Sequence, residues 1–478
     1  MDLSLSEPCV DINLPETDLK EFASKAKDWN FLHGVIMKSK KDFSDDYVQI
    51  APFLLLPSKY PKKEFNKAKL IQTSINALMH KVAHDYEFLQ STLKNTIEVD
   101  FFTSKLFDIY EKVHSEGFTQ SISLGLLRAD YMMHSTDGHK IKQVETNMIS
   151  SSFAGLSVLI TEYQRFALKE LGHMEKIANI PNNNSAEGFA MGLVEAWKLY
   201  NKKESVIMIV VEDIVYNIYD QRVIEFCVRT LNPNIVVIRK TLKDLIETAR
   251  IGPNKELLVN NMEVAVVYYR TAYQIEAYTS EKEWSVRLLI ERSLSIKCPS
   301  IHYQLAGTKK VQQQLAVPGI LEKFITDPKE VDEIRDVFMG IYSLDLNEQG
   351  DKATAMALKD PKKYVLKPQR EGGGNNVYNE EIKLQLDGMK TSKERSAWIL
   401  MERIFPPLQK NYLIKANEEV KIQNFISELG IYGVIMGDEN QIFYNTEVGH
   451  ILRTKPADAD EGGIVSGAGA LDNPYLVD

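Results

Sequence analysis

Residues 364–378 read YVLKPQREGGGNNVY. A short apolar run predicts a strand that ends at Lys367 and leads through Glu371 into three consecutive glycines. Glycine adopts positive φ without steric cost, and it lets backbone N–H groups approach a ligand closely; such N–H groups bind phosphate oxygens. Lys367 adds a positive charge, and Glu371 offers the oxygen ligand that Mg²⁺ prefers. The segment therefore predicts a phosphate site rather than a plain hairpin turn. No Gly-Lys-Ser/Thr follows, so this is not a Walker A loop.

A second polar segment lies upstream, where residues 144–156 read VETNMISSSFAGL. On a strand, Glu145 and Asn147 point to the same face. A carboxylate and an amide oxygen side by side suit Mg²⁺, and the serines that follow can hydrogen-bond a small polar substrate. Taken alone, the Glu-x-Asn pair also fits a solvated strand face.

A third segment, residues 449–475, reads GHILRTKPADADEGGIVSGAGALDNPY. If it begins as a strand, Arg453 and Lys455 share a face. The loop after them contains four glycines and can close over a site. A disordered tail is the alternative, and the many apolar residues argue against it.

The rest of the chain predicts three zones. Helices are expected first, at residues 66–90 and 99–115; the first has an apolar face made of Leu70, Ile71, Ile75, Leu78, Met79 and Val82. The polar stretch 181–186 marks a loop. Next comes an α/β unit with a parallel sheet, with strands at 205–211, 234–240 and 263–269 and a helix at 220–231. The last zone has helices near 329–341 and 351–358, a strand at 397–404 and antiparallel segments at 422–436 and 441–452.

Composition excludes several classes of protein. The net charge of −9 over 478 residues argues against a nucleic-acid-binding protein. Three cysteines form no disulfide framework, and we expect Cys227 and Cys298 to be core residues. No secretory signal is evident, and the apolar runs are too short to cross a bilayer, so we expect a cytoplasmic protein. His80 and His84 have zinc-ligand spacing, but position 81 is Lys and no third ligand follows; a satisfied histidine pair is the better interpretation.

These segments, together with LLRAD, VAVVYYRTAY, QLAGTKKVQQ and ISELGIYG, occur in an order that resembles eukaryotic glutathione synthetase from about residue 60 onward. The resemblance implies a circularly permuted ATP-grasp fold of mixed α/β class. It has a catalytic core with antiparallel sheets, a lid at about 340–420 and an inserted parallel-sheet substrate-binding domain at 204–303. Residues 1–203 then hold a helical region and the first part of the core, and residues 304–478 hold the remainder.

The same resemblance implies ATP-dependent ligation of γ-glutamylcysteine to glycine, with ADP and phosphate released. ATP phosphorylates a carboxylate to an acyl phosphate, and the amine of glycine displaces the phosphate, so the enzyme needs positioning and charge neutralisation more than a covalent nucleophile. Two Mg²⁺ ions per site and a homodimer are expected.

Site residues carry over by position. Expected metal ligands are Glu145, Asn147 and Glu371. Expected ATP contacts are Glu145, Lys309, Lys367, Pro368, Gln369, Arg370, Glu371, Gly372, Gly373, Gly374, Asn375, Asn376, Tyr378, Met401, Glu402, Arg403, Ile404, Glu428, Lys455 and Glu461. Expected substrate contacts are Arg128, Ile149, Ser150, Ser151, Ser152, Asn217, Gln221, Arg270, Tyr273, Arg453, Ile464 and Val465. Arg128, Lys367 and Arg453 are the expected catalytic residues.

Three places depart from the family pattern. Val215-Tyr216 stands where Glu-Arg is frequent, Thr271-Ala272 where Asp-Gly also occurs, and 464–467 reads Ile-Val-Ser-Gly in place of Val-Ala-Ala-Gly. The last departure bears on the acceptor, because we expect those side chains to face it. A homoglutathione-type ligase that uses another small amino acid, or an inactive ATP-binding relative, are the alternatives. An inactive relative would usually lack a metal-binding carboxylate or a phosphate-binding base. This chain retains all of the residues in question: Glu145, Asn147, Glu371, Lys309, Lys367 and Arg453.

Overall fold

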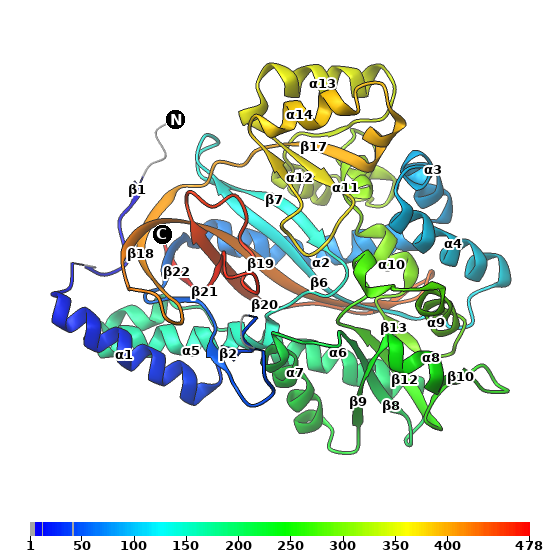
Figure 1. The fold of residues 1–478 in the computed structure, drawn as a ribbon, viewed down its shortest axis with the longest axis horizontal. Helices are drawn as coiled ribbons and strands as arrows, with labels where there is room; N and C mark the ends of the chain where they lie inside the picture. The colour runs from blue at the N-terminus through cyan, green and yellow to red at the C-terminus, as the bar shows by residue number, and fades with distance from the viewer. Residues whose placement is uncertain (1–4, 12, 41–42) are drawn as a thin grey trace.

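The computed structural model describes residues 5–11, 13–40 and 43–478, which form a mixed α/β fold around one long sheet (Figure 1). In the described part of the chain this sheet has fourteen strands. Its middle is antiparallel, and β19 (Ile422–Gly437) pairs on one side with β20 (Ile442–Pro456) and on the other with β6 (Ser123–His134). The antiparallel pairing expected for 422–436 and 441–452 is thus confirmed.

The parallel strands continue the same sheet. They are β8 (Val206–Val211), β9 (Val236–Thr241), β12 (Met262–Tyr269) and β13 (Ile296–Cys298), in the order β13-β12-β8-β9. Lys297 of β13 pairs with Ser123 of β6. The expected parallel α/β unit is confirmed, and β13 is hydrogen-bonded directly to the antiparallel part.

Shorter strands complete the sheets. β7 (Lys140–Asn147) pairs with β6, and β10 (Ala249–Ile251) and β11 (Leu257–Val259) follow the parallel end. The opposite end contains β1 (Leu5–Ser6), β4 (Phe53–Leu54), β18 (Leu408–Ile414) and β21 (Ala470–Asp472). Two small separate sheets pair β2 (Ile36–Met37) with β3 (Gln49–Ile50), and β5 (Ser58–Pro61) with β22 (Pro474–Val477).

Helices cover both faces of the sheet, since alternate residues of β19 enter two different hydrophobic clusters. Ile431 and Ile435 pack with α2 (Lys62–His84), whereas Tyr432 and Val434 pack with α6 (Ser185–Tyr200). The first cluster also takes in α3 (Tyr86–Ile97), α4 (Phe101–Glu116), α9 (Glu281–Glu291), α10 (Ile301–Ala306), α11 (Lys309–Leu315) and α12 (Pro328–Val337). The second takes in α1 (Glu16–His33), α5 (Ala154–Glu170) and α7 (Ile218–Leu231). α8 (Leu242–Thr248) follows β9.

A smaller lobe stands above the large sheet in Figure 1. This small-sheet lobe, residues 341–402, has the strand order β14-β17-β15-β16 and its own hydrophobic core. Its elements are β14 (Ile341–Ser343), α13 (Glu348–Lys359), β15 (Tyr364–Pro368), β16 (Val377–Tyr378), α14 (Glu381–Gly388) and β17 (Trp398–Glu402). The turn between β15 and β16 is the glycine segment.

Three sequence expectations are corrected. The helix expected at 66–90 is two helices. Asp85 between them is extended, and its side chain caps the start of α3 by accepting the N–H of Phe88. Leu70 is 77% exposed and does not belong to the apolar face. The helix expected at 329–341 ends at Val337, and a strand begins at Ile341. None of the helices in the described residues has the length and apolarity needed to span a membrane.

Candidate active site

Two acidic residues from distant segments converge on one lysine. Glu145 lies on β7, Glu371 lies after β15, and Lys309 begins α11. The Nζ atom of Lys309 is 3.1 Å from Oε2 of Glu145 and 2.8 Å from Oε1 of Glu371. Lys367, also buried, donates from Nζ to the carbonyl oxygen of Val144 at 3.0 Å. The second polar segment, residues 144–156, and the start of α11 are thus joined to the glycine segment.

The shared lysine affects the two carboxylates differently. Burial acts to raise the pKa of Glu145, but the charges of Lys309 and Lys367 outweigh it and lower that pKa to about 2. Burial raises the pKa of Glu371, and the negative charge of Glu145 adds to this against the attraction of Lys309. Burial also opposes the charge of Lys309, but the two carboxylates raise its pKa overall. Two half-buried carboxylates that share one ammonium group can accept more positive charge.

This geometry fits a magnesium site. The carboxylates of Glu145 and Glu371 already approach a single cationic atom, so a metal ion can reach both. Asn147 donates from Nδ2 to Oδ2 of Asp130 at 2.9 Å, which leaves its amide oxygen available as a ligand. When bound, Mg²⁺ would neutralise phosphate charge here.

Asp130 is the charge centre of the substrate side, and sequence reasoning missed it as a site residue. It is fully buried on β6. Arg128 binds it through Nε at 2.6 Å and Nη2 at 2.9 Å, and Nη2 of Arg453 lies 2.8 Å from Oδ2. Arg453 also contacts Glu428. Asp130 therefore fixes two of the predicted catalytic arginines side by side.

The serine segment is a fixed loop at the beginning of α5. Asp220 accepts the N–H groups of Phe153 at 2.7 Å and Gly155 at 2.8 Å. Arg270 donates to the carbonyl oxygen of Ser151 at 2.8 Å and to Oγ of Ser152 at 2.9 Å. Ser150 has φ 59°, Ile149 is buried, and Arg128 donates to the carbonyl oxygen of Ser152. Arg270 and Arg128 thus contact this loop together.

The glycine segment has the backbone predicted from sequence. Gly372, Gly373 and Gly374 have φ values of 94°, 72° and 77°. A Cβ atom on Gly372 would lie 3.3 Å from the ring of Tyr273, and one on Gly373 would lie 3.9 Å from Glu461. The segment therefore lies between a substrate-side tyrosine and the C-terminal loop.

Residues next to the glycines have several different partners. Gln369 accepts the N–H of Lys310 at 3.1 Å, whereas Arg370 reaches only to 4.0 Å from Asp100. Asn375 donates to the carbonyl oxygen of Gly373 at 2.9 Å, and Asn376 donates to the Tyr378 hydroxyl at 3.3 Å. Pro368 ends β15. Arg370 is thus the member of the segment that points toward α4.

The expected adenine contacts lie at the end of β17. Met401 is buried, and Glu402 accepts the Tyr342 hydroxyl at 2.7 Å. The guanidinium of Arg403 lies 5.4 Å from the centre of the Tyr378 ring, and Ile404 is half-buried. Met401 and Tyr378 both pair with Val365 of β15, so these residues lie at the same level across the small sheet.

The C-terminal loop differs from expectation in one respect. Lys455 donates to the carbonyl oxygen of Asp460 at 2.6 Å. Ile464 is only 2% exposed and belongs to the hydrophobic cluster that contains Phe153, while Val465 is half-buried against that cluster and Ser466 is exposed. The side chain of Ile464 therefore fills the core and does not line an open acceptor pocket.

The helix after β8 carries the other expected substrate contacts. Asn217 begins α7, and its Oδ1 accepts Nε2 of Gln221 at 3.2 Å. Oε1 of Gln221 accepts Nη2 of Arg239 at 2.6 Å, so Arg239 is a further neighbour that sequence reasoning missed. Val215 and Tyr216, which depart from the family pattern, are half-buried beside them.

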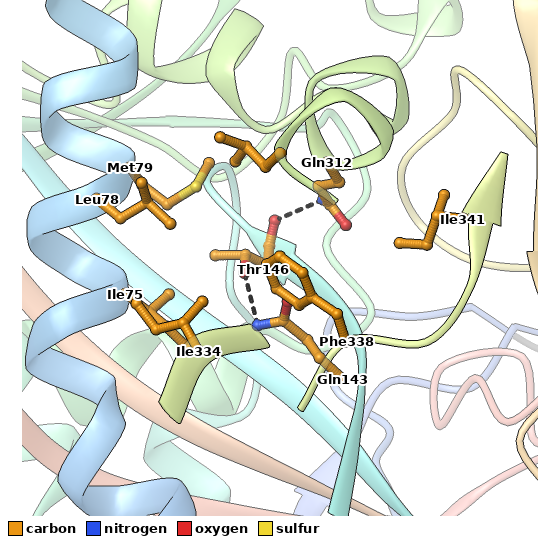
Figure 2. Close-up of a pocket in the computed structure, with 10 residues that line it drawn as sticks. Ile75, Leu78, Met79, Gln143, Thr146, Gln312, Ile334, Phe338 and Ile341 are labelled. Carbon is orange, nitrogen blue, oxygen red and sulfur yellow. Dashed lines mark hydrogen bonds between the residues drawn. The ribbon is translucent and has the colours of Figure 1, made fainter. Parts of the chain in front are cut away.

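Behind β7 lies a small cavity of about 20 Å³ (Figure 2). Thr146 points toward it, on the opposite face of the strand from Glu145 and Asn147, and Gln143 donates to its hydroxyl at 3.2 Å. Apolar side chains form most of the wall, including Ile75, Leu78, Met79, Ile334 and Phe338. Its size and lining exclude a nucleotide. The apolar side chains around it pack against β7 from behind.

The histidines and cysteines play no evident part in the site. His80 contacts the Tyr303 hydroxyl and the carbonyl oxygen of Asp438, as a satisfied histidine does. Nε2 of His84 is buried without a hydrogen-bond partner among the described residues, so the expectation of a satisfied pair holds for His80 alone. Cys298 is buried and Cys227 half-buried, and burial raises the thiol pKa of both. Across the described ranges, no cluster of three or more His, Cys, Asp or Glu side chains is arranged to hold a metal ion.

Comparisons with known proteins point to one family. Residues 16–476 match the family model described as eukaryotic glutathione synthase, ATP binding domain. The chain is 44% identical to glutathione synthetase of Xenopus laevis over 465 residues, covering 96% of this chain and 97% of the relative. It is 42% identical to the human glutathione synthetase over 463 residues, with 96% and 97% covered.

A solved structure shows the same fold. A glutathione synthetase-like effector from Globodera pallida superimposes with a TM-score of 0.79 at 24% identity, covering 98% of this chain and 99% of that one. Together, the family match and the full-length identities show that the chain belongs to the eukaryotic glutathione synthetase family.

Proposed function

We propose that this chain joins γ-glutamylcysteine to glycine, using ATP and releasing glutathione, ADP and phosphate. The observation that carries the proposal is the convergence of Glu145 and Glu371 on Lys309, beside the buried ammonium group of Lys367. Phosphoryl transfer requires positioned positive charge and metal-binding oxygens more than a covalent nucleophile. This arrangement supplies both next to a glycine segment suited to phosphate oxygens.

The reaction is expected to proceed in two steps. An oxygen of the cysteinyl carboxylate attacks the γ-phosphorus of ATP, the bond to the bridging oxygen breaks, and ADP leaves. The amine of glycine then attacks the carbonyl carbon of the acyl phosphate, phosphate leaves, and the amine loses a proton. Arg128 and Arg453, fixed by Asp130, would orient the carboxylate and offset developing negative charge. Lys309 and Lys367 would hold the phosphates.

We propose further that Glu145, Asn147 and Glu371 bind two Mg²⁺ ions with the phosphates of ATP. The small-sheet lobe would act as the lid of an ATP-grasp core, and the parallel strands would belong to the substrate-binding domain. Tyr378 and the end of β17 would contact adenine, and the serine loop with Arg270, Tyr273, Asn217 and Gln221 would contact the peptide. A homodimer working in the cytosol follows from the family pattern.

ADP release tests the function directly. The purified chain would be assayed with γ-glutamylcysteine and, separately, glycine, β-alanine, serine or alanine. We expect the highest rate with glycine, and dependence on both peptide and Mg²⁺. A higher rate with β-alanine would show a homoglutathione-type ligase, and no ADP release with any acceptor would contradict the proposal.

A further inference from the structure

A half-buried acidic side chain lies at the proposed peptide site and forms no ion pair with the described residues. Glu212 directly follows β8, and its Oε1 atom accepts the Tyr273 hydroxyl at 3.3 Å. Within the described residues that hydrogen bond is its one side-chain contact with a polar group, and it has no salt bridge. Burial raises the pKa of Glu212 more than the hydrogen bond from Tyr273 and the charges of Arg270 and Lys40 lower it. A half-buried carboxylate of this kind is unfavourable until a cation pairs with it.

The carboxylate also lines open space. A cavity of about 230 Å³ lies at the carboxyl ends of β8 and β9, and its lining includes Glu212, Val215 and Arg239. Ligands of open parallel sheets bind at these strand ends. Arg239 in turn donates to Gln221, one of the residues expected to contact the peptide. Glu212 therefore lies at the same end of the parallel strands as the residues expected to contact the peptide.

The charges of the proposed peptide indicate which kind of residue its site should also contain. γ-Glutamylcysteine carries two carboxylates and one ammonium group. The residues expected to contact it supply arginines, amides and hydroxyls, which suit the carboxylates. Of the nearby acids, Asp130 already binds two arginines, and Asp220 accepts three backbone N–H groups. Glu212 is half-buried and forms no ion pair with the described residues, whereas the other acids that line the cavity, Asp45, Asp213 and Asp244, are exposed.

We propose that Glu212 binds the ammonium group of the γ-glutamyl residue and makes the enzyme selective for donors that carry this charge. The inference rests on the proposed function and specifies how its donor is recognised. Tyr273 orients the carboxylate through its hydroxyl, and the same ring lies against Gly372. Donor recognition would therefore take place directly beside the glycine segment.

The test combines one protein change with one ligand change. Glu212→Gln keeps the size of the side chain and removes its charge, and N-glutarylcysteine is the donor without its ammonium group. We expect the wild type to prefer γ-glutamylcysteine by about tenfold to a hundredfold in kcat/KM, the range of a charge-assisted hydrogen bond. Glu212→Gln should lose most of this preference while its KM for ATP stays unchanged.

Controls separate recognition from folding. Glu276→Gln changes an exposed acid shortly after Tyr273 and should keep the wild-type preference, and unfolding midpoints should agree for all three proteins. An unaltered preference in Glu212→Gln, or an equal loss in Glu276→Gln, would overturn the inference. Calorimetric binding of the two donors gives the same comparison without turnover. Selective binding by the wild type that Glu212→Gln abolishes, without ligation, would support the ammonium site and contradict the proposed function.

Discussion

The Nζ atom of Lys309 lies 2.8 Å from a carboxylate oxygen of Glu371, and both side chains are largely buried. The contact joins the start of α11 to the glycine segment of the small-sheet lobe. It also places a proposed metal ligand beside a proposed phosphate-binding lysine. Neutralising Glu371 should therefore affect catalysis much more than folding.

We expect Glu371→Gln to reduce kcat by about a hundredfold or more, because an amide binds Mg²⁺ poorly and leaves phosphate charge uncompensated. Steady-state assays at saturating Mg²⁺ with circular dichroism measure this. Glu380→Gln, a change of an exposed acid paired with Lys383 in the same lobe, is the control and should behave as wild type. A Glu371→Gln rate within about tenfold of wild type would remove Glu371 from the metal site.

Gly372→Ala should weaken ATP binding. The φ of 94° is unfavourable for alanine, and the new Cβ would lie 3.3 Å from Tyr273. A rise of about tenfold in the KM for ATP corresponds to roughly 1.4 kcal/mol. Gly388→Ala has no neighbouring atom within 4 Å and should leave the KM unchanged. Equal values for both variants would mean that the glycine segment does not hold the phosphates.

Asp130→Asn should destabilise the fold. The change leaves Arg128 buried without its bidentate partner and removes an anion from Arg453. Breaking a buried ion pair in this way costs about 3–5 kcal/mol. Denaturant unfolding measures the loss, with the half-exposed Asp137→Asn as a control that should change little. A stable Asp130→Asn protein would show that the two arginines are compensated by other groups.

Asp472 should make stability depend on pH. Burial raises its pKa from 3.8 to about 7, against hydrogen bonds from Ser58 and Thr454. Between these values the folded protein keeps a proton that the unfolded chain has lost. Its contribution to stability is thus complete below pH 4 and declines toward pH 7, by about 1.4 kcal/mol per pH unit.

Asp472→Asn should accordingly flatten the profile of unfolding free energy between pH 5 and 8, with its largest gain over wild type at the upper end. Urea unfolding at several pH values measures the difference. A variant whose profile runs parallel to that of the wild type would assign the pH dependence to other groups.

Local sequence patterns were informative wherever a residue type strongly favours one backbone conformation or one side of a strand. Three glycines in a row predicted positive φ. Alternation along β7 predicted one shared face for Glu145 and Asn147, whose side chains contact Lys309 and Asp130. Motif resemblance added Lys309, whose contact with both carboxylates depends on segments more than 60 residues away.

Other residues could not be found locally, because their roles depend on pairing between distant strands. Asp130 becomes a charge centre only when β6 and β20 flank β19, which brings Arg453 to it. Asp220 contacts the serine loop across 67 residues. Leu70 follows the helical period but faces solvent, since apolar spacing alone does not show where a helix loses contact with the sheet.

Carboxylate activation by ATP is tested most directly by following the oxygen atoms of the donor carboxylate. γ-Glutamylcysteine labelled with ¹⁸O in both oxygens of its cysteinyl carboxylate would be converted with unlabelled ATP and glycine, and the released phosphate analysed by mass spectrometry. Because that carboxylate attacks the γ-phosphorus, each phosphate should carry one ¹⁸O atom and the glutathione should keep the other. Unlabelled phosphate formed together with glutathione would contradict carboxylate activation by ATP.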